Sequence, residues 1–199
     1  MKRLLILILL CFSLVLSADA RMSLMQLTAG PSCNNSQQIE DTASAGSQDI
    51  GSTSANYFGT KFVYSGTTGK AICKMSIWFE KVGLPTDDYY VAIWGHNVGD
   101  YPEDGDVLGT SDALDASTVP AGESEQKVSI AFTTPTAPLA NGTTYWVVVY
   151  STTYDASHFL VWHWNTDGTT ERCDYDDDGS GTWTNSSTLV TQKYRLYSR

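Results

Sequence analysis

Residues 70–198 form a succession of short runs in which apolar and polar side chains alternate, each ended by Gly, Pro, Asn or Asp. Alternation with a period of two places successive side chains on opposite faces of a strand. The strands expected from this pattern span residues 58–64, 71–80, 89–96, 107–111, 126–133, 144–151, 158–164, 170–175 and 188–197. A long loop is expected at 97–106, and no run has a helical period. This spacing predicts an all-β fold, an antiparallel two-sheet β-sandwich of jelly-roll type.

The N-terminus has the pattern of a secretion signal. Lys2 and Arg3 precede an apolar run, and Ala18-Asp19-Ala20 forms a small-residue cleavage site. A retained membrane anchor is the alternative, but the apolar run is shorter than the roughly 18–20 residues that span a bilayer. We therefore expect a signal peptide at 1–20, a secreted or cell-surface protein, and no membrane span after cleavage.

The polar segment at 21–56 differs in composition from the rest. It is rich in Ser, Thr, Gly, Gln and Asn, and has few large apolar residues after Leu27. Such a segment buries little surface, so we expect an extended N-terminal arm, followed by one sandwich domain at 57–199. A short apolar patch at 22–27 either pairs with a sheet edge, its own or a neighbour's, or is a remnant beside the cleavage site.

The formal net charge of −10 bears on the class of partner. A chain this acidic is repelled by nucleic acid and by anionic lipid headgroups. Neutral polysaccharide and protein surfaces remain as partners, although an acidic surface also serves simply to keep an exported protein soluble.

Three cysteines follow the signal: Cys33, Cys73 and Cys173. Export permits disulfides, but three cysteines cannot all pair within one chain. Alternation along 71–79 places Cys73 on the apolar side of its strand with Met75. We therefore expect Cys73 to be reduced and a disulfide between Cys33 and Cys173. No Cys-x-x-Cys occurs, so nothing indicates a zinc or redox motif.

One acidic loop has the pattern of a cation site. Asp174, Asp176 and Asp178 alternate ahead of Gly179, and oxygen ligands at alternate positions suit Ca²⁺. The twelfth position is Asn185 instead of the usual Glu, and no helices flank the loop. The alternative is an acidic β-hairpin turn at 178–181. A structural Ca²⁺ held by the three aspartates is therefore one of two hypotheses.

Aromatic residues supply the candidate ligand site. Sugars place their C–H faces on Trp and Tyr rings, while polar neighbours bind the hydroxyl groups. Trp94 and His96 share one face of their expected strand, on which Tyr90 also lies, and Trp162 and Trp164 share one face of theirs. If these faces belong to one sheet, the four side chains form a binding platform. The alternative is that these tryptophans lie in the core, as Trp146 and Trp183 are expected to do.

Catalytic motifs are missing from the sequence. There is no Gly-x-Ser-x-Gly and no His-Glu-x-x-His, and His158 and His163 point to opposite sides of their strand. Carboxylate pairs suited to glycoside hydrolysis remain conceivable, but the acidic residues gather in loops rather than in apolar strands. We expect a protein that is not an enzyme.

Several blocks are similar to a known module. They are VAIW at 91–94, VLGTSD at 107–112, LANGTTYWVVV at 139–149 and YRLY at 194–197. Together they resemble the jelly-roll module of bacterial surface proteins of the choice-of-anchor R type, which is also found in some phage tail-fibre proteins. The resemblance covers about 57–198. It implies an extracellular β-sandwich, similar to carbohydrate-binding modules, and carries over no catalytic residue.

Two functions of different classes follow. The first is a non-catalytic binding or adhesion module for carbohydrate or another cell-surface polymer. The second is a subunit of an extracellular filament or surface assembly, in which the arm at 21–56 adds a strand to the next protomer. A lone module with its own signal suits the second function, whereas the aromatic residues and the fold suit the first. The apolar patch of the arm is short and the centre of the arm is polar, which favours the binding module.

Overall fold

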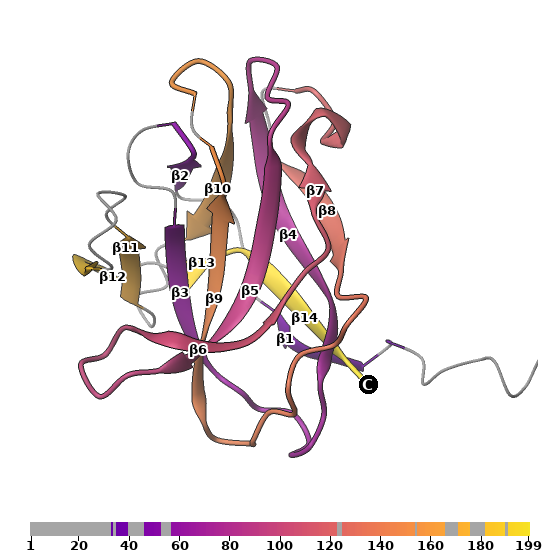
Figure 1. Cartoon of the computed structure of the whole chain (residues 1–199), viewed down its shortest axis with the longest axis vertical. Coiled ribbons are helices and arrows are strands. Elements are labelled where there is room, and N and C mark those ends of the chain that lie inside the picture. The colour runs from indigo at the N-terminus through magenta and orange to yellow at the C-terminus, as the bar shows by residue number, and fades with distance from the viewer. Residues whose placement is uncertain are drawn as a thin grey trace, which may run out of the picture. The chain divides into compact units, whose positions relative to one another are not determined.

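The computed structural model describes residues 33, 35–39, 46–52, 57–122, 125–153, 155–165, 171–175, 182–189 and 191–199. The compact unit Cys33–Arg199 is built from two sheets (Figure 1). Sheet A contains β1 (Asn35–Ile39), β2 (Gly46–Ile50), β4 (Ile72–Val82), β8 (Gln126–Ala131), β10 (Phe159–Asn165), β13 (Thr191–Gln192) and β14 (Tyr194–Ser198). Sheet B contains β3 (Tyr57–Val63), β5 (Asp88–His96), β6 (Pro102–Thr110), β7 (Leu114–Asp115), β9 (Thr144–Ser151), β11 (Glu171–Tyr175) and β12 (Trp183–Leu189).

The connections confirm the predicted fold class. Every strand pair is antiparallel, and β3, β4, β5, β8, β9, β10 and β11 pass repeatedly from one sheet to the other. This crossing pattern is that of a jelly-roll sandwich. The helical element among the described residues is one 3₁₀ turn, η1 (Ala116–Thr118), whose first turn is capped by Asp115. None of the described segments is a helix long and apolar enough to cross a bilayer.

The core lies between the sheets, where the alternation of the long strands places it. From sheet A, Met75, Ile77 and Phe79 of β4 are fully buried, and from sheet B the same holds for Val147 and Val149 of β9. The apolar side of each run therefore faces inward, as the period of two predicts.

A tyrosine hydroxyl connects the two sheets through this core. Tyr89 of β5 is 1% exposed, and its hydroxyl accepts a hydrogen bond from the Leu160 N–H at 3.1 Å. The same hydroxyl donates to the Ile50 carbonyl at 3.2 Å. Leu160 and Ile50 are cross-strand partners in sheet A, so a side chain of sheet B bridges two strands of the opposite sheet.

Part of the expected arm belongs to the sandwich. The strand β1 pairs with β14, β2 pairs with β10, and Ile50 is fully buried in the core. The domain therefore begins before residue 57. The alternation of apolar residues does not reveal these edge strands, because they are mostly polar and Ile50 is the buried apolar residue that β2 supplies. The expected signal at 1–20 and the patch at 22–27 lie outside the described residues.

The expected cysteine pairing is wrong. Cys33 forms its disulfide with Cys73, with a Cα–Cα distance of 5.9 Å. The reason is a bulge in β4: Ser198 pairs with Ile72 and Tyr197 with Lys74, which leaves Cys73 as the extra residue. A bulge interrupts the alternation, so Ile72 instead faces the core. Cys173 lies in β11 of the other sheet, opposite Gly59 of β3.

Candidate functional site

The outer face of sheet B, opposite the core, carries a row of aromatic residues on neighbouring strands. In register order these are Trp183 of β12, Tyr175 of β11, Tyr57 of β3, Tyr150 of β9 and Tyr90 of β5. We call Trp183, Tyr57, Tyr150 and Tyr90 the aromatic row, since their side chains are described. All four are partly exposed. These five residues come from five separate segments of the chain, and only long-range strand pairing brings them opposite one another.

The tyrosines of the aromatic row stack on one another across the strands. The rings of Tyr57 and Tyr150 have centroids 4.7 Å apart and planes 15° apart, and those of Tyr90 and Tyr150 have centroids 5.4 Å and planes 20° apart. These distances match the spacing between strands, so the rings face one another and direct their edges away from the sheet. Burial raises the pKa of Tyr150, and the neighbouring Tyr57 adds to that effect.

Beside the row lies a second apolar layer. Trp94 and Trp146 are cross-strand partners on the outer face, 9% and 0% exposed, and they pack with Ala92 and Val148. The Trp94 ring meets Tyr57 at 6.4 Å and Trp183 at 5.7 Å, with an interplanar angle of 82° to Trp183. The aromatic row is therefore held against a packed support rather than standing alone.

The segment that joins β5 to β6 covers one end of this layer. Figure 1 shows β6 passing across the lower ends of β3 and β9. A β-carbon on Gly59 would stand 3.5 Å from Pro102 and 3.5 Å from the Trp146 ring, so the bare glycine backbone lies directly under both. β6 starts at Pro102, inside the segment 97–106 where the sequence predicts a loop.

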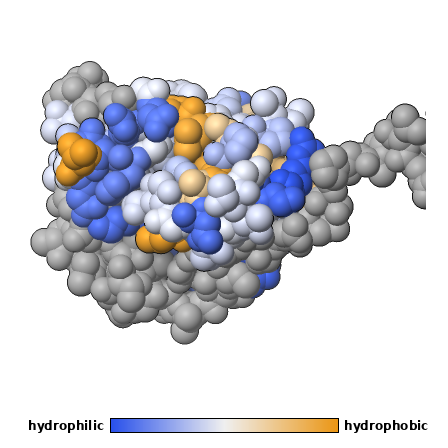
Figure 2. All heavy atoms as spheres, turned by 90° about the horizontal axis from the view of Figure 1, so that it is seen from below, coloured by the Kyte–Doolittle hydropathy of each residue, from blue (hydrophilic) through white to orange (hydrophobic). Residues whose placement is uncertain are grey.

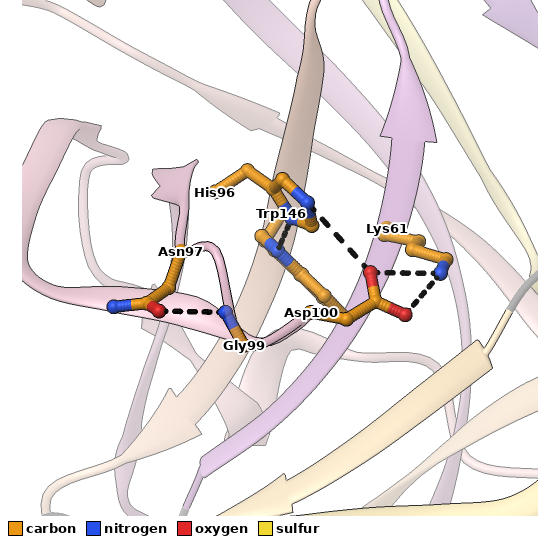
Figure 3. A network of polar contacts seen from close by, with 6 residues as sticks. All are labelled: Lys61, His96, Asn97, Gly99, Asp100 and Trp146. Atoms are coloured by element: carbon orange, nitrogen blue, oxygen red, sulfur yellow. Dashed lines mark hydrogen bonds and ion pairs between the residues drawn. The ribbon is translucent and has the colours of Figure 1, made fainter.

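A polar network holds this segment in place (Figure 3). Lys61 Nζ of β3 lies 3.0 and 2.7 Å from the two carboxylate oxygens of Asp100, which has a φ of 66°. His96 Nε2 lies 3.7 Å from Asp100 Oδ1, and the Trp146 indole N–H donates to His96 Nδ1 at 3.1 Å. Because Nδ1 accepts this bond, the proton of a neutral His96 is on Nε2, toward Asp100.

The turn beneath this network is closed by its own backbone. The Asn97 side-chain oxygen accepts from the Gly99 N–H at 2.8 Å, and the Asp100 N–H donates to the Asn97 carbonyl at 3.0 Å. A side-chain oxygen that binds the N–H two residues on is the usual way for Asn to start a turn. Lys61, Asp100 and His96 thus form a fixed polar end to the layer of Trp94 and Trp146, on the same face of sheet B as the aromatic row.

A few large apolar side chains outside the aromatic row are also exposed. Seen from below the view of Figure 1, the described surface is mainly hydrophilic, with small hydrophobic patches between polar side chains (Figure 2). The large apolar side chains with the highest exposure include Val98, Leu84 and Val63. Scattered apolar residues of this kind are ordinary on a soluble surface, so the aromatic row remains the more informative feature.

The four side chains of the expected platform do not meet. Trp94 and His96 lie in β5, on the outer face of sheet B. Trp162 and Trp164 lie in β10 of sheet A. Trp162 is fully buried in the core, where its indole N–H donates to the Lys193 carbonyl at 3.0 Å. The alternative hypothesis, that a tryptophan of this strand belongs to the core, is correct for Trp162.

Two further tryptophans differ from expectation in opposite ways. The Trp164 indole lies against Gly46 of β2 so closely that a β-carbon there would overlap it. Trp183, expected in the core, is partly exposed at the end of the aromatic row. Alternation in a single sequence tells which residues of a strand share a face, but it does not tell which of the two faces packs against the other sheet.

The expected calcium site lies mostly outside the described residues. Asp174 belongs to β11, opposite Phe58 and Thr184, whereas Asp176 and Asp178 are not described. β11 and β12 pair antiparallel, with Tyr175 opposite Trp183, and the turn expected at 178–181 lies outside the described residues. Elsewhere in the described part of the chain no three His, Cys, Asp or Glu side chains gather in a way that would hold a metal ion. Calcium binding stays a prediction.

Several residues in this site have no signal in the local sequence pattern. Tyr150 sits in a strand whose two faces are both apolar, and Tyr57 lies just before the strand expected at 58–64, so the pattern does not say that either tyrosine points outward. Lys61 and Asp100 are 39 residues apart, and only the folded register brings them together. Tyr90 shares its face with Trp94 and His96, and was the one member of the row with a readable signal.

Comparison with models of known protein families finds no match, and neither does comparison with curated proteins. The resemblance to choice-of-anchor R modules therefore remains an expectation from short blocks of sequence.

Proposed function

We propose that this chain is a secreted, non-catalytic binding module that holds a carbohydrate on the outer face of sheet B. The observation that carries the proposal is the aromatic row, four partly exposed rings on four strands of one face. Aromatic side chains on a monomeric surface are more often single than arranged in a line. Such a line suits an extended polymer better than a small compact ligand.

The chemistry of the face supports a sugar polymer as the ligand. Tyrosine edges offer apolar C–H surface together with hydroxyl groups, and a sugar offers the same two kinds of surface. The polar end adds a carboxylate, an ammonium and an imidazole, from Asp100, Lys61 and His96, which suit hydroxyl groups. Because Lys61 and Asp100 neutralise each other, this end favours an uncharged ligand.

The disulfide supports export. A bond between Cys33 and Cys73 forms and persists in an oxidising compartment, which agrees with the expected signal at 1–20. The ligand would then be a polysaccharide or cell-surface glycan outside the cell, and the module an adhesion element. A Ca²⁺ ion held by Asp174, Asp176 and Asp178 would have a structural role in this proposal.

The test is a binding screen against neutral polysaccharides by affinity electrophoresis, using Tyr90→Ala and Tyr150→Ala. Each substitution is expected to weaken binding by about fivefold, since one aromatic contact contributes on the order of 1 kcal/mol. The matched control is Tyr197→Ala, a partly exposed tyrosine on the outer face of sheet A. Retention of a bound glycan by both row variants at wild-type affinity would contradict the proposal.

A further inference from the structure

One lysine of sheet A is held in place through its backbone. Lys193 lies between β13 and β14, and its N–H donates to the His163 carbonyl at 2.9 Å. The Lys193 carbonyl accepts the indole N–H of Trp162 at 3.0 Å. Trp162 and His163 are consecutive residues of β10, so this strand fixes the backbone of Lys193 on both sides of its α-carbon.

The side chain of Lys193 is buried although it carries a charge. It is 3% exposed, and its Nζ lies 2.6 Å from Oε1 of the partly exposed Glu125. The same Nζ lies 5.4 Å from the centre of the Trp78 ring, which is itself buried. Taking an ammonium and a carboxylate out of water costs free energy that their attraction returns only in part. A reaction that consumes both charges therefore gains more here than it would on the surface.

An imidazole faces the second oxygen of the same carboxylate. His163 Nδ1 lies 3.9 Å from Glu125 Oε2, and His163 Nε2 lies 3.2 Å from Glu80 Oε2. The His163 side chain is 12% exposed, so it faces these oxygens with little water around it. A protonated imidazole carries a hydrogen on each nitrogen, and it can thus stabilise negative charge that develops on Glu125 Oε2.

We propose that Lys193 and Glu125 condense to an amide, so that the mature chain carries an isopeptide bond between the segment ahead of β14 and the segment ahead of β8. A bond forms between Lys193 Nζ and the carboxyl carbon of Glu125, and the bond from that carbon to Oε1 breaks. The ammonium gives up two protons, which leave with Oε1 as one water. The charges of the two groups cancel, and no oxidant, reductant or cofactor is consumed.

The contacts give each group its role. One proton of the ammonium passes to Glu125 Oε1 across the 2.6 Å contact, and the neutral amine then attacks the carboxyl carbon. Oε2 becomes the amide oxygen, and His163 stabilises the negative charge that it carries during the attack. Oε1 leaves as water after it has taken the second proton from the nitrogen. Glu80 touches no reacting atom and is a positioning residue for the imidazole.

Fixed geometry favours a condensation that free amines and carboxylates do not undergo in water. Two groups held in reacting position behave as if each met the other at roughly 10⁵–10⁸ M. The two backbone hydrogen bonds of Lys193 supply this fixed position. The burial of its side chain beside Trp78 limits the access of water, which would hydrolyse the bond.

A second trio of the same groups serves as an internal comparison. Lys61 Nζ lies 2.7 Å from Asp100 Oδ2, and His96 Nε2 lies 3.7 Å from Asp100 Oδ1. The distances resemble those around Lys193, but the side chains of Lys61 and Asp100 are 23% and 44% exposed. Because water reaches this pair, we expect it to remain an ion pair. Burial of the lysine is thus the feature that sets Lys193 apart.

The first experiment is a mass measurement and a tryptic peptide map of the full mature wild-type chain after reduction and alkylation. The chain is expected to be lighter than its sequence by one water. Trypsin does not cut after an acylated lysine, so the peptides 82–127 and 173–195 should be recovered joined to each other. Recovery of 82–127 and 173–193 as separate peptides of full mass would overturn the proposal. A loss of water confined to a single peptide, as from a succinimide at an Asp-Gly pair, would also count against it.

A conservative variant tests the lysine. Lys193→Arg keeps a cation beside Glu125 but removes the amine, so the loss of one water should disappear. The matched control is Lys61→Arg, the same change in the exposed ion pair, and it should be lighter by one water like the wild type. Thermal unfolding checks that both variants fold. A mass deficit that persists in Lys193→Arg would show that another pair of groups has condensed.

The histidine is tested by the rate of linking. In His163→Asn the linked fraction at a fixed time after synthesis should correspond to a rate at least about tenfold lower, because the group that stabilises Oε2 is gone. The control is His158→Asn, since His158 also contacts a carboxylate, that of Asp155, at 2.9 Å. Linking of His163→Asn at the wild-type rate would overturn the role given to His163. Glycan binding by the aromatic row has no part in these measurements, so this proposal and the proposed function are tested separately.

Discussion

Single atoms at the centre of the sandwich hold its sheets in register, and the Tyr89 hydroxyl is the clearest example. Tyr89→Phe would remove the acceptor of the buried Leu160 N–H and the donor to the Ile50 carbonyl. We expect the free energy of unfolding to fall by about 1–3 kcal/mol, as when buried polar groups lose their partner. Urea unfolding measures this loss. Tyr101→Phe, on an exposed residue, is the control and should stay within about 0.5 kcal/mol of the wild type.

The same residue makes stability depend on alkaline pH. Burial, with a smaller contribution from the charges of Asp87 and Asp155, raises the pKa of Tyr89 to about 12, although its hydrogen bonds act to lower that pKa. The unfolded chain releases this proton near pH 10, whereas the native state keeps it up to about pH 12. The free energy of unfolding of the wild type therefore falls as the pH rises from about 10 to about 12. Tyr89→Phe lacks this loss. The stability difference between the two proteins should therefore narrow across that window, and a constant difference would contradict the assignment.

The His96 ring is held in one tautomer by a neighbouring indole. Because the Trp146 N–H donates to Nδ1, neutral His96 carries its proton on Nε2. Nitrogen-15 NMR of the imidazole should show this tautomer in the wild type. In Trp146→Phe the donor is gone, and we expect a mixture of both tautomers. A wild-type spectrum with the proton on Nδ1 would show that the network in Figure 3 is incorrect.

At the scale of strands and sheets, the alternation of apolar residues predicts more than half of the architecture. It places β4, β5, β8, β9 and β10 within a residue or two of their observed ends, because each of these strands buries one face or two. It does not find β1 and β2, whose polar composition hides their pairing, nor the bulge at Cys73. Edge strands and bulges depend on partners far along the chain, which a local pattern does not contain.

The same limit explains the site. The sequence identifies Tyr90, Trp94 and His96 as one face of β5, but which strands flank β5 is decided by the whole topology. Trp162 has the same local pattern as Trp94, yet Trp162 lies in the core and Trp94 on the outer face of its sheet. Alternation therefore predicts which side chains share a strand face. Which face is buried, and which strands lie beside it, depends on long-range pairing.

The disulfide connects the first described element to the middle of sheet A. Replacing both Cys33 and Cys73 by Ser would release a link across 40 residues, and we expect a loss of about 2–4 kcal/mol in unfolding free energy. Peptide mapping without reduction should recover the Cys33–Cys73 pair. Cys173→Ser is the control and should leave that pair intact, whereas a Cys33–Cys173 peptide from the wild type would disprove the observed pairing.

At the scale of the whole molecule, the outer face of sheet B is the feature that the proposed function uses. The tyrosines of the aromatic row stack across β3, β9 and β5, and Lys61 and Asp100 neutralise each other on the same face. An extended, uncharged polymer is the ligand that we propose for such a face.

Two deletions separate this binding hypothesis from assembly through the N-terminal segment. Removing residues 21–32 leaves the compact unit Cys33–Arg199 entire, so its thermal midpoint should change by less than about 2 °C. Removing residues 21–56 takes away β1, β2, Cys33 and the buried Ile50. A loss of roughly 4 kcal/mol should then lower the midpoint by about 10 °C.

Negative-stain microscopy and size exclusion of the same proteins decide the function. If the module acts by binding, the mature chain and the shorter deletion are both monomers and bind the same glycans. If the mature chain forms filaments that the 21–32 deletion abolishes while its fold is retained, assembly is the function instead. That outcome would place the joining element ahead of Cys33, because β1 and β2 already pair within their own sheet.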